Sequence, residues 1–314
     1  DRTFSYSLGA GGVATGSINV ITLNMNRLIQ DGRDLATEVS KIQRYQVAYR
    51  ALMEEYKNAG LLTVYDAGFI SLDKQFLTIG INGMTEAAEY LGLQPGNNVP
   101  YLDFVRGQLK IIYDANRQAR QDYGYMFNTE FVPAENLGVK NAKWDREDGY
   151  QVNRDCYNSY FYLVEDEQNN LLDKFVLHGK TLLEYLDGGS ALHLNLEEKL
   201  HAKGNLALLD LAAKTGCNYF CVNVRITLCN SCQHIDKRTR HSCSKCGSND
   251  IDYGTRVIGY LKRVSAFSKA RRAEHQRRHY HWQSHADIPS LVQPQTDAQH
   301  QNVQHPSARR QSEP

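Results

Sequence analysis

Four of the seven cysteines form two C-x-x-C pairs with the spacing C-x2-C-x10-C-x2-C. They are Cys229, Cys232, Cys243 and Cys246, and Gly247 follows the second pair directly. Each pair can place two thiolates on one side of a tight turn, and two such turns complete a tetrahedral metal site. A closed four-thiolate site has no position for water, so the sequence predicts a structural zinc ion. An iron–sulfur cluster or a dithiol redox pair is the alternative.

A basic stretch follows this cysteine cluster and suggests one possible function. A zinc ribbon with arginines and lysines after it is typical of proteins that bind the nucleic-acid phosphate backbone, which is our alternative reading. The basic residues are Arg256, Lys262, Arg263, Lys269, Arg271, Arg272, Arg277 and Arg278. The apolar stretch from Val257 to Leu261 argues against this reading, because Gly259 between large apolar side chains indicates a buried loop tip.

The composition excludes several other classes of protein. The chain has 314 residues, a net charge of +1 and 41% hydrophobic residues, enough for one large domain or two smaller ones. No apolar run approaches the ~18–20 residues of a membrane span, so we expect no membrane partner. A metal site is favoured over disulfides, which indicates a reducing, cytoplasmic location. The N-terminus shows no signal peptide, and the first residue, Asp1, suggests a fragment or a processed product.

Strand-like and helix-like segments alternate along the chain, which predicts an α/β architecture with a largely parallel sheet or barrel. Apolar and β-branched runs predict buried strands over residues 18–24 and 76–81 and further strands over 127–132, 157–163, 192–196 and 219–226. Amphipathic spacing predicts helices over residues 32–59, 84–91, 101–123 and 206–215. Residues 283–314 contain no aromatic residue and few aliphatic ones, so we expect a disordered tail there.

The segment Tyr253–Leu261, just after the cysteine cluster, resembles the glycyl-radical loop of class III anaerobic ribonucleoside-triphosphate reductases. Other segments are similar to this family and follow its order along residues 5–281. They are Thr22–Leu28 (T-x-N-x-x-R-L), Thr78–Glu86 (T-I-G-I-x-G-x-x-E), Asn128–Glu135 (ending in P-A-E), Tyr157–Ser159 and Gly188–His193 (G-G-[ST]-x-x-H). No single segment is decisive, but the ordered set together with the cysteine cluster is.

This resemblance implies a fold and a division of the chain. The family has a ten-stranded α/β barrel made of two antiparallel half-barrels, and residues 1–226 would form the C-terminal part of that barrel. Residues 227–252 would form the zinc ribbon, and residues 253–282 the glycyl-radical loop with the C-terminal segment. Residues 283–314 would be the tail.

The resemblance also implies anaerobic radical chemistry that makes deoxyribonucleotides for DNA replication. In the family, a radical-SAM activating enzyme removes a hydrogen atom from the loop glycine, which corresponds here to Gly259. The glycyl radical oxidises a cysteine to a thiyl radical, which takes the 3′-hydrogen of the ribonucleotide before the 2′-hydroxyl leaves. Glycine suits this role because a planar Cα radical is delocalised over the adjacent amide and carbonyl, and a Cβ would crowd it. The zinc site would fix the loop that carries Gly259.

The sequence departs from the family at the cysteine that forms the thiyl radical. That cysteine should lie on a finger loop before Gly9–Gly16, but the first cysteine is Cys156. Cys156, Cys217 and Cys221 are interpreted as small buried residues, with a redox role for Cys217 and Cys221 as the alternative. We therefore expect a C-terminal half that cannot reduce nucleotides alone. Its partners would be the missing N-terminal half, the activating enzyme and a second copy.

Two turns are candidates for contacts with ribonucleoside triphosphates. Gly188, Gly189 and Ser190 could present N–H groups and a hydroxyl to phosphate oxygens, and Asn158 and Ser159 could do the same. The same five residues could equally be ordinary turn residues, and the sequence leaves both readings open. Direct binding of nucleic acid is not expected on this reading.

Overall fold

The computed structural model describes residues 16–131, 136–197, 199–256 and 261–281. Its first part is a parallel sheet in which the strands follow the order β1-β2-β3-β4. The strands are β1 (Ser17–Asn24), β2 (Phe76–Asn82), β3 (Phe127–Phe131) and β4 (Gly189–Ser190). β2 and β3 are buried along their whole length, as expected for inner strands of a parallel sheet. β1 lies at the edge and is mostly half-buried. The prediction of a strand over residues 18–24 is therefore confirmed, but the prediction that this strand is buried is wrong.

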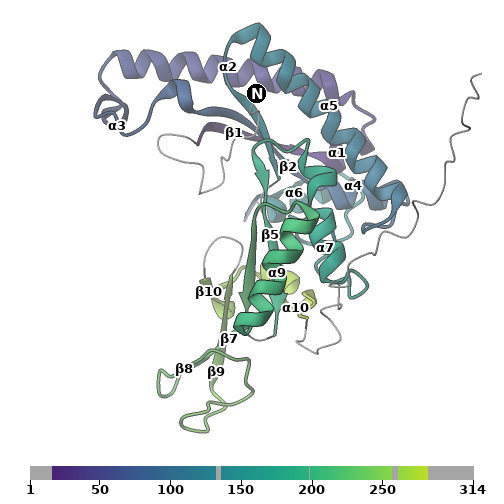
Figure 1. The fold of residues 1–314 in the computed structure, drawn as a ribbon, viewed down its shortest axis with the longest axis vertical. Helices are drawn as coiled ribbons and strands as arrows, with labels where there is room; N and C mark the ends of the chain where they lie inside the picture. The colour runs from purple at the N-terminus through teal and green to yellow at the C-terminus, as the bar shows by residue number, and fades with distance from the viewer. Residues whose placement is uncertain (1–15, 132–135, 198, 257–260, 282–314) are drawn as a thin grey trace, which may run out of the picture.

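Two long helices pack on this sheet and lie side by side in the upper part of Figure 1. They are α2 (Leu35–Asn58) and α5 (Val99–Tyr123). α2 begins after Asp34, whose carboxylate accepts the Thr37 N–H at 2.9 Å as an N-cap. The other helices of this part are α1 (Met25–Gln30), α3 (Thr63–Asp66), η1 (Leu72–Lys74), α4 (Met84–Tyr90) and α6 (Leu137–Glu147).

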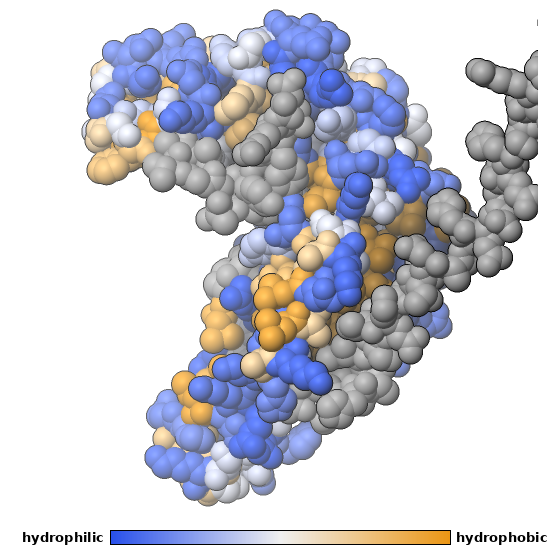
Figure 2. Space-filling view, viewed as in Figure 1, coloured by the Kyte–Doolittle hydropathy of each residue, from blue (hydrophilic) through white to orange (hydrophobic). Residues whose placement is uncertain are grey.

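A β–α–β unit follows in the middle of the chain. Strand β5 (Leu192–Leu196) pairs in parallel with β6 (Phe220–Val224), and helix α9 (Ala202–Thr215) connects them. Helices α7 (Leu171–Leu177) and α8 (Lys180–Leu183) precede this unit. One core cluster joins it to the first sheet and includes Leu192 and Leu194 as well as Ile79 and Phe131. Figure 2 shows apolar surface over the middle of the molecule, where α9 exposes Leu206 and Leu209.

The last part of the described chain is an antiparallel sheet in the order β10-β9-β7-β8, which extends to the lower end of Figure 1. Its strands are β7 (Ile226–Cys229), β8 (Ile235–Asp236), β9 (Ile251–Arg256) and β10 (Leu261–Arg263). The short helix η2 (Val264–Ala266) and helix α10 (Lys269–Arg277) follow. The described residues thus combine parallel β–α units with an antiparallel ribbon.

Most of the predicted elements are confirmed within one turn, but two of the predicted strands are wrong. The aromatic segment 157–163 is buried, yet its backbone forms bends and irregular structure rather than a strand. Two of its backbone donors are taken by side chains: Asn158 N–H donates to Glu86 and Phe161 N–H to His178. The segment 219–226 is not one strand, because the chain divides at Arg225 into β6 and β7, which belong to different sheets.

Several predictions concern parts of the chain that the structure leaves undescribed. Val132–Glu135, the loop residues 257–260 with Gly259, and the predicted tail 283–314 lie outside the described residues. Within the described ranges, no helix combines the length and the apolar composition that a membrane crossing requires.

Candidate functional site

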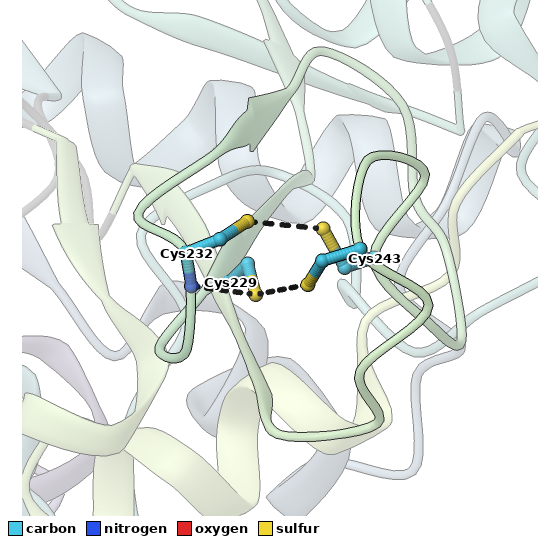
Figure 3. Close-up of side chains that lie close together, drawn as sticks. Cys229, Cys232 and Cys243 are labelled. Carbon is cyan, nitrogen blue, oxygen red and sulfur yellow. Dashed lines mark hydrogen bonds between the residues drawn. The ribbon is translucent and has the colours of Figure 1, made fainter.

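The four cysteines of the C-x-x-C pairs converge at the end of the antiparallel ribbon. Cys229 ends β7, Cys232 lies in the turn after it, and Cys243 and Cys246 lie in the loop before β9. Figure 3 shows the two turns facing each other with their sulfur atoms turned inward. The Sγ atoms of Cys229 and Cys246 are 3.7 Å apart, and those of Cys232 and Cys243 are 3.6 Å apart. All four ligand atoms lie within 4.8 Å of one another.

These distances fit a tetrahedral metal ion. Four sulfurs at ~2.3 Å from a central ion are ~3.8 Å from one another, close to the observed separations. Backbone N–H groups point at the sulfurs, as Cys232 N–H does toward Cys229 Sγ at 3.4 Å. The N–H groups of Cys246 and Lys245 lower the pKa of Cys243 to about 6, whereas the neighbouring thiols of Cys232, Cys243 and Cys229 raise that of Cys246 to about 12. Gly247 adopts a left-handed φ of 73°, which lets the second turn close.

The ribbon also leads directly to the segment that contains Gly259. β9 carries the chain from the cysteine loop to Arg256, and β10 begins at Leu261. Arg256 and Leu261 are paired across the β9–β10 ladder, so the four residues 257–260 connect two paired strand ends. Gly259 itself lies outside the described residues, and its predicted role stays a prediction.

The basic stretch that suggested nucleic-acid binding is partly buried in ion pairs. Arg271 and Arg278 lie on α10 and at its C-cap, with 7% and 5% of their side chains exposed. Both contact Glu274, and Arg278 does so with Nε at 2.7 Å and Nη2 at 2.8 Å. Burial acts to raise the pKa of Glu274, but the two guanidinium groups outweigh it and lower that pKa. Arginines buried in this way do not form the exposed basic surface that a nucleic-acid backbone needs, so nucleic-acid binding is not favoured.

The predicted contact residues Asn158 and Ser159 lie beside α10. Asn158 N–H donates to Glu86 Oε1 at 2.9 Å, and its Oδ1 accepts the Val164 N–H. Ser159 is 5% exposed, and within the described residues its hydroxyl has no hydrogen-bond partner. A hollow at this place is lined by side chains of the turn and of α10: Tyr157, Asn158, Ser159, Tyr160, Val164, Arg271, Glu274 and Arg278. The structure thus brings together a free hydroxyl and two guanidinium groups.

The other predicted turn, Gly188–Ser190, is buried and already hydrogen-bonded. Gly188 N–H donates to Thr129 O at 2.8 Å, and Gly189 N–H donates to Leu186 O at 2.9 Å. Ser190 Oγ lies 2.7 Å from His178 Nδ1. Because His178 Nε2 accepts the Phe161 N–H, the proton is on Nδ1, which donates to Ser190. His178 therefore links Ser190 to the segment 157–163, which contains Asn158 and Ser159. The roles of both candidate turns in binding stay predictions.

Several buried polar residues near these turns were not predicted. Arg154 contacts Glu86, Glu89 and Glu165, and Lys174 Nζ lies 2.6 Å from His281 Nε2. Burial, together with the Lys174 ammonium, lowers the pKa of His281 to about 3. Predicting them would have required knowing which charged residues are buried, and the sequence does not reveal this.

The three remaining cysteines lie away from the cysteine cluster. Cys156 and Cys217 are buried, and Cys221 is half-buried. Burial raises the pKa of Cys156 to about 12 and that of Cys217 and Cys221 to about 11. Thiols with a raised pKa are poorly reactive, in agreement with their interpretation as small packing residues.

Comparison with known proteins gives a consistent result. A family model for "Anaerobic ribonucleoside-triphosphate reductase" matches residues 2–281. A solved anaerobic ribonucleotide reductase is 28% identical, with a TM-score of 0.79, over 89% of this chain and 47% of that one. The enzyme of Thermotoga maritima in complex with dATP and CTP is also 28% identical, with a TM-score of 0.75, over 86% of this chain and 46% of that one.

The chain therefore spans less than half the length of these solved structures. No curated protein sequence matches it. The match of the family model nevertheless covers most of the chain, including the cysteine cluster and both candidate turns. The chain belongs to the anaerobic ribonucleoside-triphosphate reductase family.

Proposed function

We propose that this chain carries the glycyl radical of an anaerobic ribonucleoside-triphosphate reductase at Gly259 and holds a structural zinc ion. The family match over residues 2–281, which includes Gly259, is the observation that carries this proposal. Cys229, Cys232, Cys243 and Cys246 would hold the zinc ion, which would cross-link the two cysteine turns. Gly259 follows Cys246 by thirteen positions, and β9 connects the cysteine loop to the segment that contains it. The ribbon would therefore set the position of the loop.

The proposal includes the fold and the partners of the whole enzyme. The parallel sheet and the β5–α9–β6 unit are compatible with part of a ten-stranded barrel, followed by the ribbon at 227–252 and the loop segment at 253–282. The proposed partners are a radical-SAM activating enzyme, the part of the reductase that this chain does not span, and a second copy of the chain. The proposed location is the cytoplasm.

Ribonucleoside triphosphates are the proposed substrates, since a similar solved enzyme is in complex with CTP. Among the candidate contacts, the hollow beside Ser159 has the best chemistry for a negatively charged substrate group. It offers a buried hydroxyl without a partner and lies beside Arg271 and Arg278. Asn158 would contribute from the same turn. Gly188 and Gly189 would act mainly by holding the neighbouring strand β3, because their N–H groups are already used, whereas the Ser190 hydroxyl, which accepts a hydrogen bond from His178, stays a candidate contact.

Radical formation is the decisive experiment. Anaerobic treatment with a radical-SAM activating enzyme, S-adenosylmethionine and a reductant should give a doublet electron-paramagnetic-resonance signal. Oxygen should then cut the activated chain near Ile258. Both results should be lost in Gly259→Ala and kept in Gly107→Ala, which changes a glycine in the middle of α5 with open space around it. An activated chain that shows neither signal nor cleavage would contradict the proposal.

A further inference from the structure

We propose that Asn223 and Arg278 are positioning residues for the radical loop, because together they fix the main chain of Arg256. Arg256 is the last described residue before the segment 257–260. The contacts lie entirely within the described residues, whereas their consequence for radical formation rests on the proposed function of Gly259. The two parts of this inference can therefore be tested separately.

Asn223 holds the N–H group of Arg256 from the β6 side. It is 3% exposed, and its Oδ1 accepts both the Arg256 N–H at 3.1 Å and the Thr255 hydroxyl at 2.9 Å. Its Nδ2 donates to Asn195 Oδ1 at 2.8 Å on the neighbouring strand β5. If the Asn223 amide were turned over, its Nδ2 would point at the Arg256 N–H, so these contacts determine the orientation of the amide.

Arg278 holds the carbonyl group of the same residue. Its Nη1 donates to Arg256 O at 2.9 Å, while Nε and Nη2 form a two-point contact with Glu274. The side chain is 5% exposed; burial opposes its charge, but Glu274 outweighs that effect and raises the pKa of Arg278. A planar guanidinium held at two points has little freedom, so the third contact fixes the carbonyl in space.

This arrangement uses both main-chain groups of one residue at a strand end. In an antiparallel ladder, alternate residues keep their N–H and C=O for partners outside the pair. Arg256, which faces Leu261, gives both to buried side chains instead of water. Asn223 and Arg278 lie 33 and 22 residues away in the sequence, on two different elements. Arg256, the last described residue before the segment 257–260, is thus held from β6 and from the end of α10 at once.

Hydrogen–deuterium exchange of the Arg256 amide tests the contact itself. Asn223→Leu should accelerate this exchange about tenfold, the factor that corresponds to losing one hydrogen bond of about 1.4 kcal/mol. Asn223→Asp keeps the acceptor, and Asn195 can turn its amide to donate to the new carboxylate, so exchange should stay near the native rate. Arg278→Lys keeps the charge but loses the two-point contact, and it should also accelerate exchange.

Asn116→Leu is the matched control. Asn116 is equally buried, at 1% exposed, and uses its side chain on Gln43 and Thr129 within the first part of the molecule. It should lower the unfolding temperature without changing exchange at Arg256. Equal acceleration in Asn116→Leu, or none in Asn223→Leu and Arg278→Lys, would overturn the proposed positioning.

The yield of radical in activated samples tests the consequence. Asn223→Leu and Arg278→Lys should lower the doublet signal several-fold, whereas Asn116→Leu and Asn223→Asp should keep most of it. Equal yields in all four variants would overturn the positioning role. A wild-type chain that forms no radical would contradict the proposed function instead, and the exchange experiment would still decide whether Asn223 and Arg278 hold Arg256.

Discussion

Arg154 Nη1 lies 3.0 Å from Glu86 Oε1, and the two side chains are 8% and 2% exposed. Glu89 and Glu165 contact the same guanidinium at 2.6 and 3.2 Å. Burial raises the pKa of Glu86, while the Arg154 charge and the Asn158 N–H act in the opposite direction. Since Glu86 Oε1 accepts that N–H, the buried ion pair also holds the turn with the candidate residues Asn158 and Ser159.

Removing Arg154 should therefore be costly, and the cost should depend on pH. Arg154→Met leaves Glu86 buried without its partner, so we expect a loss of roughly 3–5 kcal/mol in the free energy of unfolding at neutral pH. The folded-state pKa of Glu86 then rises further above its unfolded value. The folded protein binds the extra proton below that pKa, so the loss should be smaller near pH 5 and grow as the pH increases. Urea unfolding at both pH values measures this.

Two further variants separate this ion pair from surface effects. Arg154→Met combined with Glu86→Gln should recover part of the loss at neutral pH, because no buried charge is then left at that position. Asp114→Asn breaks an exposed pair with Lys110 on α5 and should change stability by less than about 1 kcal/mol. A loss that is the same at both pH values, with no recovery in the double variant, would contradict this account of Glu86.

The cysteine cluster should hold one metal ion, and zinc is the expected one. Elemental analysis of the purified protein should find one zinc per chain, and Cys229→Ser should remove it together with the protection of the ribbon from proteolysis. Cys221→Ser is the control, because Cys221 is a half-buried thiol on β6 outside the cluster and its loss should leave the zinc content unchanged. Zinc retained in Cys229→Ser, or iron found in its place, would show that the predicted site is wrong.

The cysteine site could be predicted from the sequence because its ligands are close along the chain. Each C-x-x-C pair forms its half of the site within one turn, so spacing alone indicates the geometry. The long helices and inner strands could be predicted for a similar reason, since their apolar periodicity is local. In helix α10 and at its C-cap, the burial of Arg271 and Arg278 was missed, because the basic residues of this segment suggested a phosphate-binding surface. Glu274 lies three residues after Arg271 and four before Arg278, a spacing that favours a helix.

The rest of the site depends on contacts between distant residues. Arg154 and Glu86 are 68 residues apart, and Lys174 and His281 are 107 apart. A charged residue in a sequence is normally interpreted as exposed, so nothing local reveals such pairs. The segment 157–163 shows the same difficulty. Its aromatic residues correctly indicate burial, but burial alone does not determine whether the backbone is a strand or a series of bends.

Gly188 is expected to tolerate no larger side chain. A Cβ at this position would lie 2.8 Å from Thr129 O, closer than real Cβ contacts, and a tight 3.0 Å from Asn128 Nδ2. Gly188→Ala should therefore weaken the hydrogen bond to Thr129 and destabilise the protein by about 1–3 kcal/mol in urea unfolding. Gly107→Ala meets nothing within 4 Å on helix α5 and should instead stabilise by about 0.5–1 kcal/mol. Equal effects of the two substitutions would contradict the close packing of β3 and β4.

His178 should make the protein sensitive to mild acid. Burial and the neighbouring His193 lower its pKa to about 3, against the ordinary value of 6.5. The unfolded chain therefore binds more protons between these values, and the free energy of unfolding should fall as the pH decreases through that window. One such group accounts for a loss of about 2 kcal/mol between pH 6.5 and pH 5. Urea unfolding across this range should show the decrease.

The contribution of His178 can be isolated from that of the other histidines by comparing slopes. His178→Gln should lower stability at neutral pH, because Phe161 N–H and Ser190 Oγ lose a well-placed partner. The stability of this variant should then fall less steeply toward pH 5, since its unfolded chain can no longer bind a proton at position 178. His201→Gln changes an exposed histidine and should keep the native slope. If His178→Gln also keeps that slope, the acid sensitivity arises elsewhere in the fold.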